Sequence, residues 1–264
     1  MGIKTTLATA AAALLLLGIT VVPGAQAHAR PSLLTGLQAR AKAADMTSLN
    51  WAGYVVPEAG GHPITEVHTK FTVPATQTVS IGGAAMWTGI GGFGTPDLIQ
   101  AGVSTGDILN GTYAWFEILP AAEQILFNDC KGDPTCTVNT GDTVEVWIKN
   151  LGGDHWYMAM NDFNHWVWST KLDYHSSESS AEWILEATSL IAVPMFVPFM
   201  DDVTFGKGNT FTVAGGKPLP IGAGHPLSTS MALAMVVPEA QPSPLSADGD
   251  RFRGCAFKSR CDAP

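Results

Sequence analysis

Charged side chains are scarce in this sequence. They make up 14% of its 264 residues, whereas about 25% is typical of globular proteins. Only 14 residues are Lys or Arg, and the formal net charge is −9. This balance argues against nucleic-acid binding, which requires a basic face. With so few positive charges, acid would create little self-repulsion once the carboxylates are neutralised, so the composition is compatible with a protein that works in acid.

Apolar runs long enough to cross a membrane are absent after the N-terminal segment. There, Lys4 precedes an apolar run over residues 7–22, Pro23-Gly24 end it, and Ala25-Gln26-Ala27 has the small residues of a cleavage site. This pattern is typical of a secretory signal peptide, and the run is short for a membrane anchor. We expect a signal peptide at residues 1–27, a loose arm or short propeptide at 28–45, and a single secreted domain at 46–264.

Metal-binding motifs are also missing. The seven His residues are scattered and include no HExxH motif. The four Cys residues form two C-x5-C pairs, Cys130 with Cys136 and Cys255 with Cys261, whereas zinc sites usually have shorter spacings. In an exported chain, two local disulfides are the natural interpretation, although spacing alone does not fix the connectivity. We expect no metal and no cofactor.

Alternation of apolar and polar residues dominates the remaining sequence. Residues 66–73, 113–119 and 143–149 each alternate with a period of two, which predicts β-strands. Clusters of Gly, Pro, Asn and Asp separate such segments and predict turns. The only helical candidate is at residues 33–44. The pattern therefore predicts an all-β domain, either a sandwich or a barrel.

Two predicted strands carry long polar side chains among apolar neighbours. Gln100 lies in the first, at residues 97–102, while Glu182 and Glu186 share one face of the second, at residues 181–186. A Gln can donate a hydrogen bond to an oxyanion, and a Glu can act as a general base. The G-x-S-x-G match around Ser104 predicts no serine nucleophile, because that motif works only in a strand-to-helix turn and no helix pattern follows it.

Six motifs of this sequence resemble, in order, the strand motifs of the eqolisins, a family of glutamic endopeptidases. They are Asn50-Trp51-Ala52-Gly53-Tyr54, Phe71-Thr72-Val73-Pro74, Met86-Trp87-Thr88-Gly89-Ile90, Leu98-Ile99-Gln100-Ala101-Gly102, Ala114-Trp115-Phe116-Glu117 and Ala181-Glu182-Trp183-Ile184-Leu185-Glu186. The resemblance implies a two-sheet antiparallel β-sandwich of the jelly-roll, concanavalin A-like type, with the active site on a concave sheet face.

The resemblance also implies site residues. Gln100 and Glu186 match the catalytic pair of the family, so that Glu186, and not Glu182, would be the base. The substrate groove is expected at Trp87 and Glu117, and Trp51, Gly102 and Trp115 lie in the same motifs and are expected beside it. The implied protein is a secreted, acid-acting and monomeric endopeptidase of polypeptides that needs no metal.

Two other functions fit parts of the sequence. A glycoside hydrolase on a similar sandwich would use Glu182 and Glu186, and retaining chemistry would require their carboxyl groups to be about 5–5.5 Å apart. A lectin-like binding module without catalysis would make equal use of the eight Trp residues. Degradation of denatured protein would distinguish a peptidase from both.

Overall fold

A computed structural model describes residues 46–58, 60–79, 83–163, 165–190, 193–194, 196–222, 231–235 and 239–264. This part of the chain consists of strands and loops and contains no helix. Accordingly, the described residues include no helix with the length and apolar character needed to cross a membrane. The expected signal peptide, the arm that follows it and the helical candidate at residues 33–44 lie outside the described residues.

The first sheet has eight strands in the order β1-β17-β2-β11-β4-β5-β6-β7, and only the β1–β17 pair is parallel. Its strands are β1 (Met46–Ser48), β17 (Met231–Met235), β2 (Trp51–Pro57), β11 (Ser180–Ala187), β4 (Ala84–Gly91), β5 (Leu98–Asp107), β6 (Gly111–Ile118) and β7 (Gln124–Ile125). Because β11 lies between β2 and β4, and β4 lies between β11 and β5, strands far apart in the sequence meet at the centre of this sheet.

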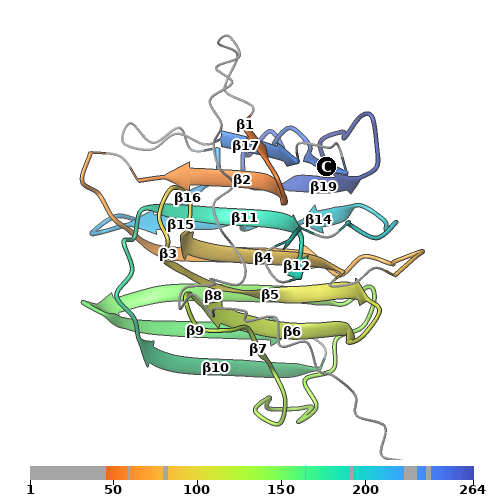
Figure 1. Ribbon diagram of the computed structural model, residues 1–264. Coiled ribbons are helices and arrows are strands. Elements are labelled where there is room, and N and C mark those ends of the chain that lie inside the picture. Colours follow the sequence, from red (N-terminus) through yellow and green to blue (C-terminus); the bar gives the residue numbers. More distant parts are fainter. Residues whose placement is uncertain are drawn as a thin grey trace, which may run out of the picture.

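The second sheet has nine strands, seven of them in the order β10-β9-β8-β3-β14-β19-β18, while β15 pairs with β3 and β16 with β15. Its strands are β3 (Ile64–Thr72), β8 (Thr143–Gly152), β9 (His155–Asp162), β10 (Trp166–Asp173), β14 (Val203–Phe205), β15 (Thr210–Val213), β16 (Leu219–Pro220), β18 (Ala240–Pro242) and β19 (Phe252–Ala256). A separate short pair joins β12 (Ser189–Leu190) to β13 (Val193–Pro194). Figure 1 shows that the strand axes of the two large sheets are nearly aligned with one another, as in aligned sandwich packing.

Alternation along each strand produces the core between the sheets. In β8, Val144, Val146 and Ile148 are fully buried, while Trp147 and Lys149 between and after them are exposed. The main hydrophobic cluster combines such residues with the matching face of the first sheet, including Trp183 and Leu185 of β11. The predicted two-sheet antiparallel sandwich is therefore confirmed.

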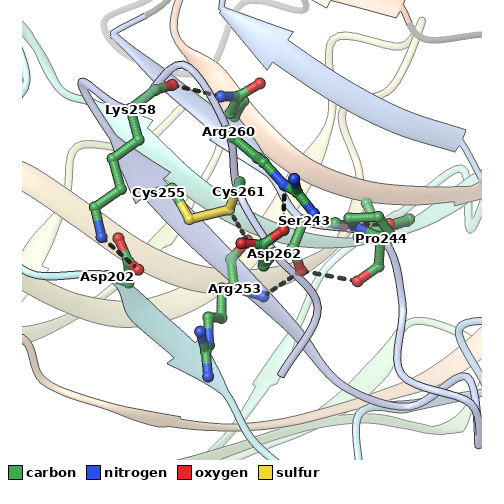
Figure 2. Close-up of a disulfide and its surroundings, with 11 residues drawn as sticks. Asp202, Ser243, Pro244, Arg253, Cys255, Lys258, Arg260, Cys261 and Asp262 are labelled. Atoms are coloured by element: carbon green, nitrogen blue, oxygen red, sulfur yellow. Dashed lines mark hydrogen bonds and ion pairs between the residues drawn. A yellow bond between two sulfur atoms is a disulfide. The ribbon is translucent and has the colours of Figure 1, made fainter.

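Two disulfides each close a short loop. Cys130 is bonded to Cys136 in the loop after β7, and Cys255 of β19 is bonded to Cys261 in the C-terminal tail. Figure 2 shows the second disulfide beside the ion pair between Lys258 Nζ and Asp202 Oδ2, whose atoms are 2.8 Å apart. Both predicted cysteine pairs are therefore present, and no free Cys remains among the described residues.

Candidate active site

The functional side chains lie in rows that cross four central strands of the first sheet. Residues that pair directly across antiparallel strands point to the same face. In the first row, Glu182 of β11 pairs with Gly89 of β4, which pairs with Gln100 of β5, which pairs with Glu117 of β6. We call these four residues the Gln100 row. It brings together residues of four motifs that are up to 93 positions apart in the sequence, from Gly89 to Glu182.

Two further rows lie beside the Gln100 row on the same face. The middle row, here called the Trp87 row, contains Ile184, Trp87, Gly102 and Trp115, in the strand order β11, β4, β5 and β6. The last, called the Glu186 row, contains Glu186, Ala85, Ser104 and Tyr113 in the same strand order. Gln100 and Glu186 thus lie on one face, separated by β4 and by the Trp87 row.

This face has its own apolar cluster, which is distinct from the core between the sheets. It contains Trp51, Val55, Ala85, Trp87, Leu98, Trp115, Leu119 and Ile184. The rings of Trp51 and Trp87 meet edge to face with their centroids 5.0 Å apart. The cluster therefore surrounds the polar side chains of the face with low-dielectric material, which strengthens electrostatic effects there.

Glu186 is held at both of its carboxyl oxygens. The Asn50 side chain donates a hydrogen bond from Nδ2 to Oε1 over 2.6 Å, and the Trp87 indole donates one from Nε1 to Oε2 over 2.7 Å. Asn50 immediately precedes β2 and Trp87 lies in β4, so the two strands that flank β11 fix the carboxyl group from both sides. Each oxygen keeps a lone pair for a further donor such as water.

Gln100 is oriented by Glu117. Its side chain donates a hydrogen bond from Nε2 to Glu117 Oε2 over 2.6 Å. An amide nitrogen has two protons, so one remains for another acceptor. Neither Gln100 Oε1 nor Glu117 Oε1 has a hydrogen-bonding partner among the described residues, and both atoms are buried. The pair is thus partly unsatisfied, as is expected of a site that binds a further polar molecule.

Burial raises the pKa of each carboxyl group in this area. It raises the pKa of Glu186 to about 7, although the N–H groups of Trp87, Trp51 and Asn50 favour the ionised form. Burial, followed by the charges of Glu186 and Glu123, raises the pKa of Glu117 to about 8. Burial also raises the pKa of Glu123, in the loop after β6, to about 7. Below neutral pH these groups therefore hold protons, which keeps several carboxyl groups from repelling one another.

Glycine is required where the Trp87 indole crosses the sheet. A Cβ atom on Gly102 would clash with the Met86 carbonyl oxygen and with Cβ of Trp87, and one on Gly89 would lie 3.1 Å from Cζ3 of the Trp87 ring. The two glycines thus leave room for the backbone and side chain of Trp87.

Glu182 has different surroundings from Glu186. It is fully buried, and neither of its carboxyl oxygens has a hydrogen-bonding partner among the described residues. Burial raises its pKa well above the usual range, opposed by the Ser180 hydroxyl. The nearby Ser180 hydroxyl makes no hydrogen bond to the carboxyl group. Glu182 therefore lacks the hydrogen bonds that orient Glu186 at both of its oxygens.

The remaining predicted site residues all lie on this face. Trp51, Trp87 and Trp115 are only 2%, 0% and 3% exposed, and Glu117 is 2% exposed. That they line an open groove stays a prediction; what the structure shows is that Trp87 binds Glu186 and Glu117 binds Gln100. Ser104 lies within β5 and is fully buried, so it is not at a strand-to-helix turn.

Sequence reasoning missed two residues of the site. Asn50 begins the first resembling motif, yet only Trp51 was selected from it. Glu123 lies between β6 and β7, outside every motif, and no local pattern marks its proximity to Glu117. The position of Asn50, a hydrogen-bonding residue directly before Trp51, is the sequence signal that could have identified it.

One group of possible metal ligands exists in the described part of the chain, and it belongs to the second sheet. Ligand atoms of Asp142, Asp162 and His165 lie within 4.8 Å of one another. His165 Nδ1 is 3.6 Å from Asp142 Oδ2 and 3.5 Å from Asp162 Oδ2, which also suits ion pairs. The group contains no residue of the three rows.

Solved structures share this fold. Scytalido-glutamic peptidase with a transition-state analogue inhibitor aligns with a TM-score of 0.61 and 16% identity, covering 79% of this chain and 98% of that one. SCP-B, an eqolisin in complex with the tripeptide Ala-Ile-His, aligns with a TM-score of 0.57, 16% identity and the same coverage. A search of curated protein sequences gives no significant match.

The sequence itself matches a family model. Residues 49–230 fit the model of the Peptidase A4 family, that of the eqolisins. The match begins just before β2 and includes β4, β5, β6 and β11, the four strands that carry the three rows. Neither the glycoside hydrolase nor the lectin-like alternative gains such support. Since the match extends over well more than half of the chain, the protein belongs to the Peptidase A4 family, the eqolisins, and is a peptidase.

Proposed function

We propose that this chain is an exported, monomeric glutamic endopeptidase that hydrolyses polypeptides with Gln100 and Glu186 as its catalytic pair. The observation that carries the proposal is the Glu186 carboxyl group, which is buried on the same sheet face as Gln100 and held at both oxygens by Asn50 and Trp87. The similarity to structures of scytalido-glutamic peptidase with transition-state analogues, one of them peptide-based, supports this assignment.

In the proposed mechanism, ionised Glu186 removes a proton from a water molecule, which attacks the carbonyl carbon of the scissile peptide bond. The C–N bond then breaks, and protonated Glu186 returns the proton to the leaving amine. The hydrogen bonds from Asn50 and Trp87 hold the carboxyl group in one orientation during both transfers. All atoms of the added water end in the two products, so no cofactor enters the balance.

Gln100 would stabilise the negative charge that develops on the carbonyl oxygen. One proton of its Nε2 is directed to Glu117 Oε2, and the other would be donated to the oxyanion. A single donor of this kind is typically worth about 2.7–4 kcal/mol of transition-state stabilisation. Glu117 would act as a positioning residue, because its hydrogen bond restrains the amide before the substrate arrives.

The pKa values specify the expected pH dependence. Glu186 must be ionised to accept a proton, and its pKa is about 7. The ionised fraction therefore rises about tenfold per pH unit from pH 4 to pH 6 and levels off near 7. Glu117, with a pKa of about 8, stays neutral beside Glu186 over that range. We propose an enzyme whose activity rises through mild acid, levels off near pH 7 and falls above pH 8, where Glu117 also ionises and adds a second negative charge beside Gln100 and Glu186.

Export is the second part of the proposal. Two disulfides, Cys130–Cys136 and Cys255–Cys261, are expected of a protein that folds in an oxidising compartment. Sequencing the N-terminus of the protein from the culture medium should identify a start near His28 or after a short propeptide. Recovery of the protein only inside cells, with residues 1–27 intact, would contradict export.

Casein hydrolysis across pH 3–9 is the direct test of the activity. The purified protein should cleave casein, with no inhibition by pepstatin or by a chelator, and Gln100→Ala should lower kcat/KM by about 10²–10³-fold. Far-UV circular dichroism of the variant establishes that it folds. Chelator-sensitive cleavage, or an active Gln100→Ala variant, would contradict the proposed catalytic pair.

A further inference from the structure

The outer face of the second sheet contains a pocket of about 620 Å³ over β8, β9 and β10. Its position follows from the strand register. Trp147 of β8 pairs with Ala159 of β9, which pairs with Ser169 of β10. A large ring therefore stands beside two small side chains on one face, and the hollow lies above the small ones. We call this hollow the outer trough.

Trp147 forms a rigid wall of the outer trough. It is the one Trp of the described residues whose side chain is largely exposed, at 44%. Its indole Nε1 nevertheless donates a hydrogen bond to Glu66 Oε1 over 2.6 Å, and Glu66 is in turn paired with Lys149. The His68 ring packs edge to face against it at 5.4 Å. The indole is thus fixed in advance, so a ligand that stacks on it loses little conformational entropy.

The opposite wall is a loop that is fastened in two ways. It carries Asp129 and Lys131, and the Cys130–Cys136 disulfide closes it. Lys131 N donates to Val167 O over 2.8 Å, and Val167 N donates to Lys131 O over 2.9 Å, which joins the loop to β10. Gly132 permits this approach, because a Cβ atom there would clash with the His165 carbonyl oxygen.

The ends of the outer trough supply hydrogen-bonding groups. Tyr157 lies at one side of Ala159 on β9 and Asn161 at the other, and Ser169 contributes a hydroxyl to the floor. The charges partly compensate one another, since the lining includes both Asp129 and Lys131. Glu145 already pairs with His68 at 2.8 Å and with Lys70 at 3.5 Å. No excess positive charge is available to attract an anionic ligand.

From this combination we propose that the outer trough binds a neutral oligosaccharide built of β-linked hexoses. The apolar C–H face of such a sugar stacks on an exposed indole, and its hydroxyl groups bond with amide, hydroxyl and carboxylate groups around it. An extended peptide fits less well. A peptide that added to the edge strand β10 would be blocked at Val167, whose main-chain N–H and C=O groups already bind the loop beside the trough.

The outer trough and the proposed catalytic residues lie on different sheets. The outer trough lies on the second sheet and faces away from the core, whereas Glu186 and Gln100 lie on the first sheet. A sugar bound in the trough would leave the catalytic face open. The site would therefore anchor the peptidase to glycan-rich material without competing with its polypeptide substrate.

Isothermal titration calorimetry with cellopentaose and laminarihexaose tests the proposal on the intact mature protein. We expect a Kd of about 1 mM or tighter for at least one of them, with no binding of an oligogalacturonate. Trp147→Ala should weaken the binding at least about tenfold. Phe199→Ala is the matched control, because Phe199 is an equally exposed aromatic outside the trough, and it should bind sugar normally.

Two further variants keep the test decisive if Trp147→Ala folds poorly. Ala159→Gln places a larger side chain at the bottom of the outer trough, and Cys130→Ser/Cys136→Ser removes the disulfide from the loop that forms its wall. Both variants should weaken sugar binding and leave casein hydrolysis unchanged. The proposal is overturned if neither sugar binds, or if the folded trough variants bind it like the wild type. It is also overturned if Trp147→Ala reduces the binding of unfolded casein instead of sugar, since the trough would then be a peptide site.

Discussion

The hydrogen bond from Trp87 to Glu186 should set the pH at which the enzyme becomes active. Trp87→Phe keeps an aromatic ring in the apolar cluster but removes the Nε1 proton that lies 2.7 Å from Glu186 Oε2. A hydrogen bond to a charged group contributes about 1.5–3 kcal/mol, and one pKa unit corresponds to about 1.36 kcal/mol. The lost bond stabilised the ionised form. The pKa of Glu186 should therefore rise by about 1–2 units above its value of about 7.

The dependence of kcat/KM on pH measures this pKa, because its ascending limb reports the ionisation of the base in the free enzyme. The limb of Trp87→Phe should shift to higher pH, with the rate at pH 6 reduced about 10–100-fold. Trp115→Phe is the matched control. Trp115 lies in the same cluster, but its buried indole Nε1 has no hydrogen-bonding partner among the described residues.

The control should lose some stability and keep the pH profile of the wild type. An unchanged limb in folded Trp87→Phe would refute the reasoning. So would an equal shift in both variants, because the effect would then come from the loss of ring volume and not from the hydrogen bond.

Three other predictions concern stability. The thermal midpoint should fall as the pH is raised from 5 to 9. The pKa values of Glu186 and Glu117 are higher in the folded state than the unfolded value of 4.5, so both groups stabilise the fold fully below pH 4.5, and this stabilisation disappears as the pH passes about 7 and 8. A midpoint that rises over this range would contradict the prediction. Replacing Cys130 and Cys136 together by Ser should lower the free energy of unfolding by about 2 kcal/mol, because the disulfide closes a short loop. Urea denaturation measures this change. An unchanged denaturation midpoint would contradict the prediction and would show that the loop is held by its other bonds. Gly102→Ala should prevent folding because its Cβ would clash with backbone atoms, whereas Gly206→Ala, whose Cβ would have one neighbour at 3.6 Å, should fold. Circular dichroism distinguishes these outcomes. A folded Gly102→Ala variant would contradict the prediction and would mean that β4 and β5 can separate locally.

The strands could be predicted from the sequence because a sheet with one buried face imposes a period of two. The predicted segments at 66–73, 113–119 and 143–149 correspond to β3 (Ile64–Thr72), β6 (Gly111–Ile118) and β8 (Thr143–Gly152). Strand order could not be predicted in this way. Alternation reports which side chains share a face of one strand, and the pairing of β11 with both β2 and β4 depends on contacts between distant segments.

The same limit applies to the surroundings of the site residues. Glu182 and Glu186 have identical local patterns, yet Glu182 has no hydrogen-bonding partner for its carboxyl oxygens among the described residues, whereas Glu186 is bonded to Asn50 and Trp87. Likewise, the sequence does not distinguish Trp87, which is fully buried, from Trp147, which is exposed in a strand of similar composition. Burial of a strand residue depends on what covers its sheet face, and that information is not in the strand itself.

The central claim is that Glu186 is the base and that Glu182 is not. Glu186→Gln and Glu182→Gln make the same chemical change four residues apart on one face of β11, so each controls for the other. With both variants shown to fold, kcat for casein or a peptide substrate at pH 6 should be almost abolished in Glu186→Gln, and Glu182→Gln should retain clearly more activity. A folded and inactive Glu182→Gln beside an active Glu186→Gln would contradict the account.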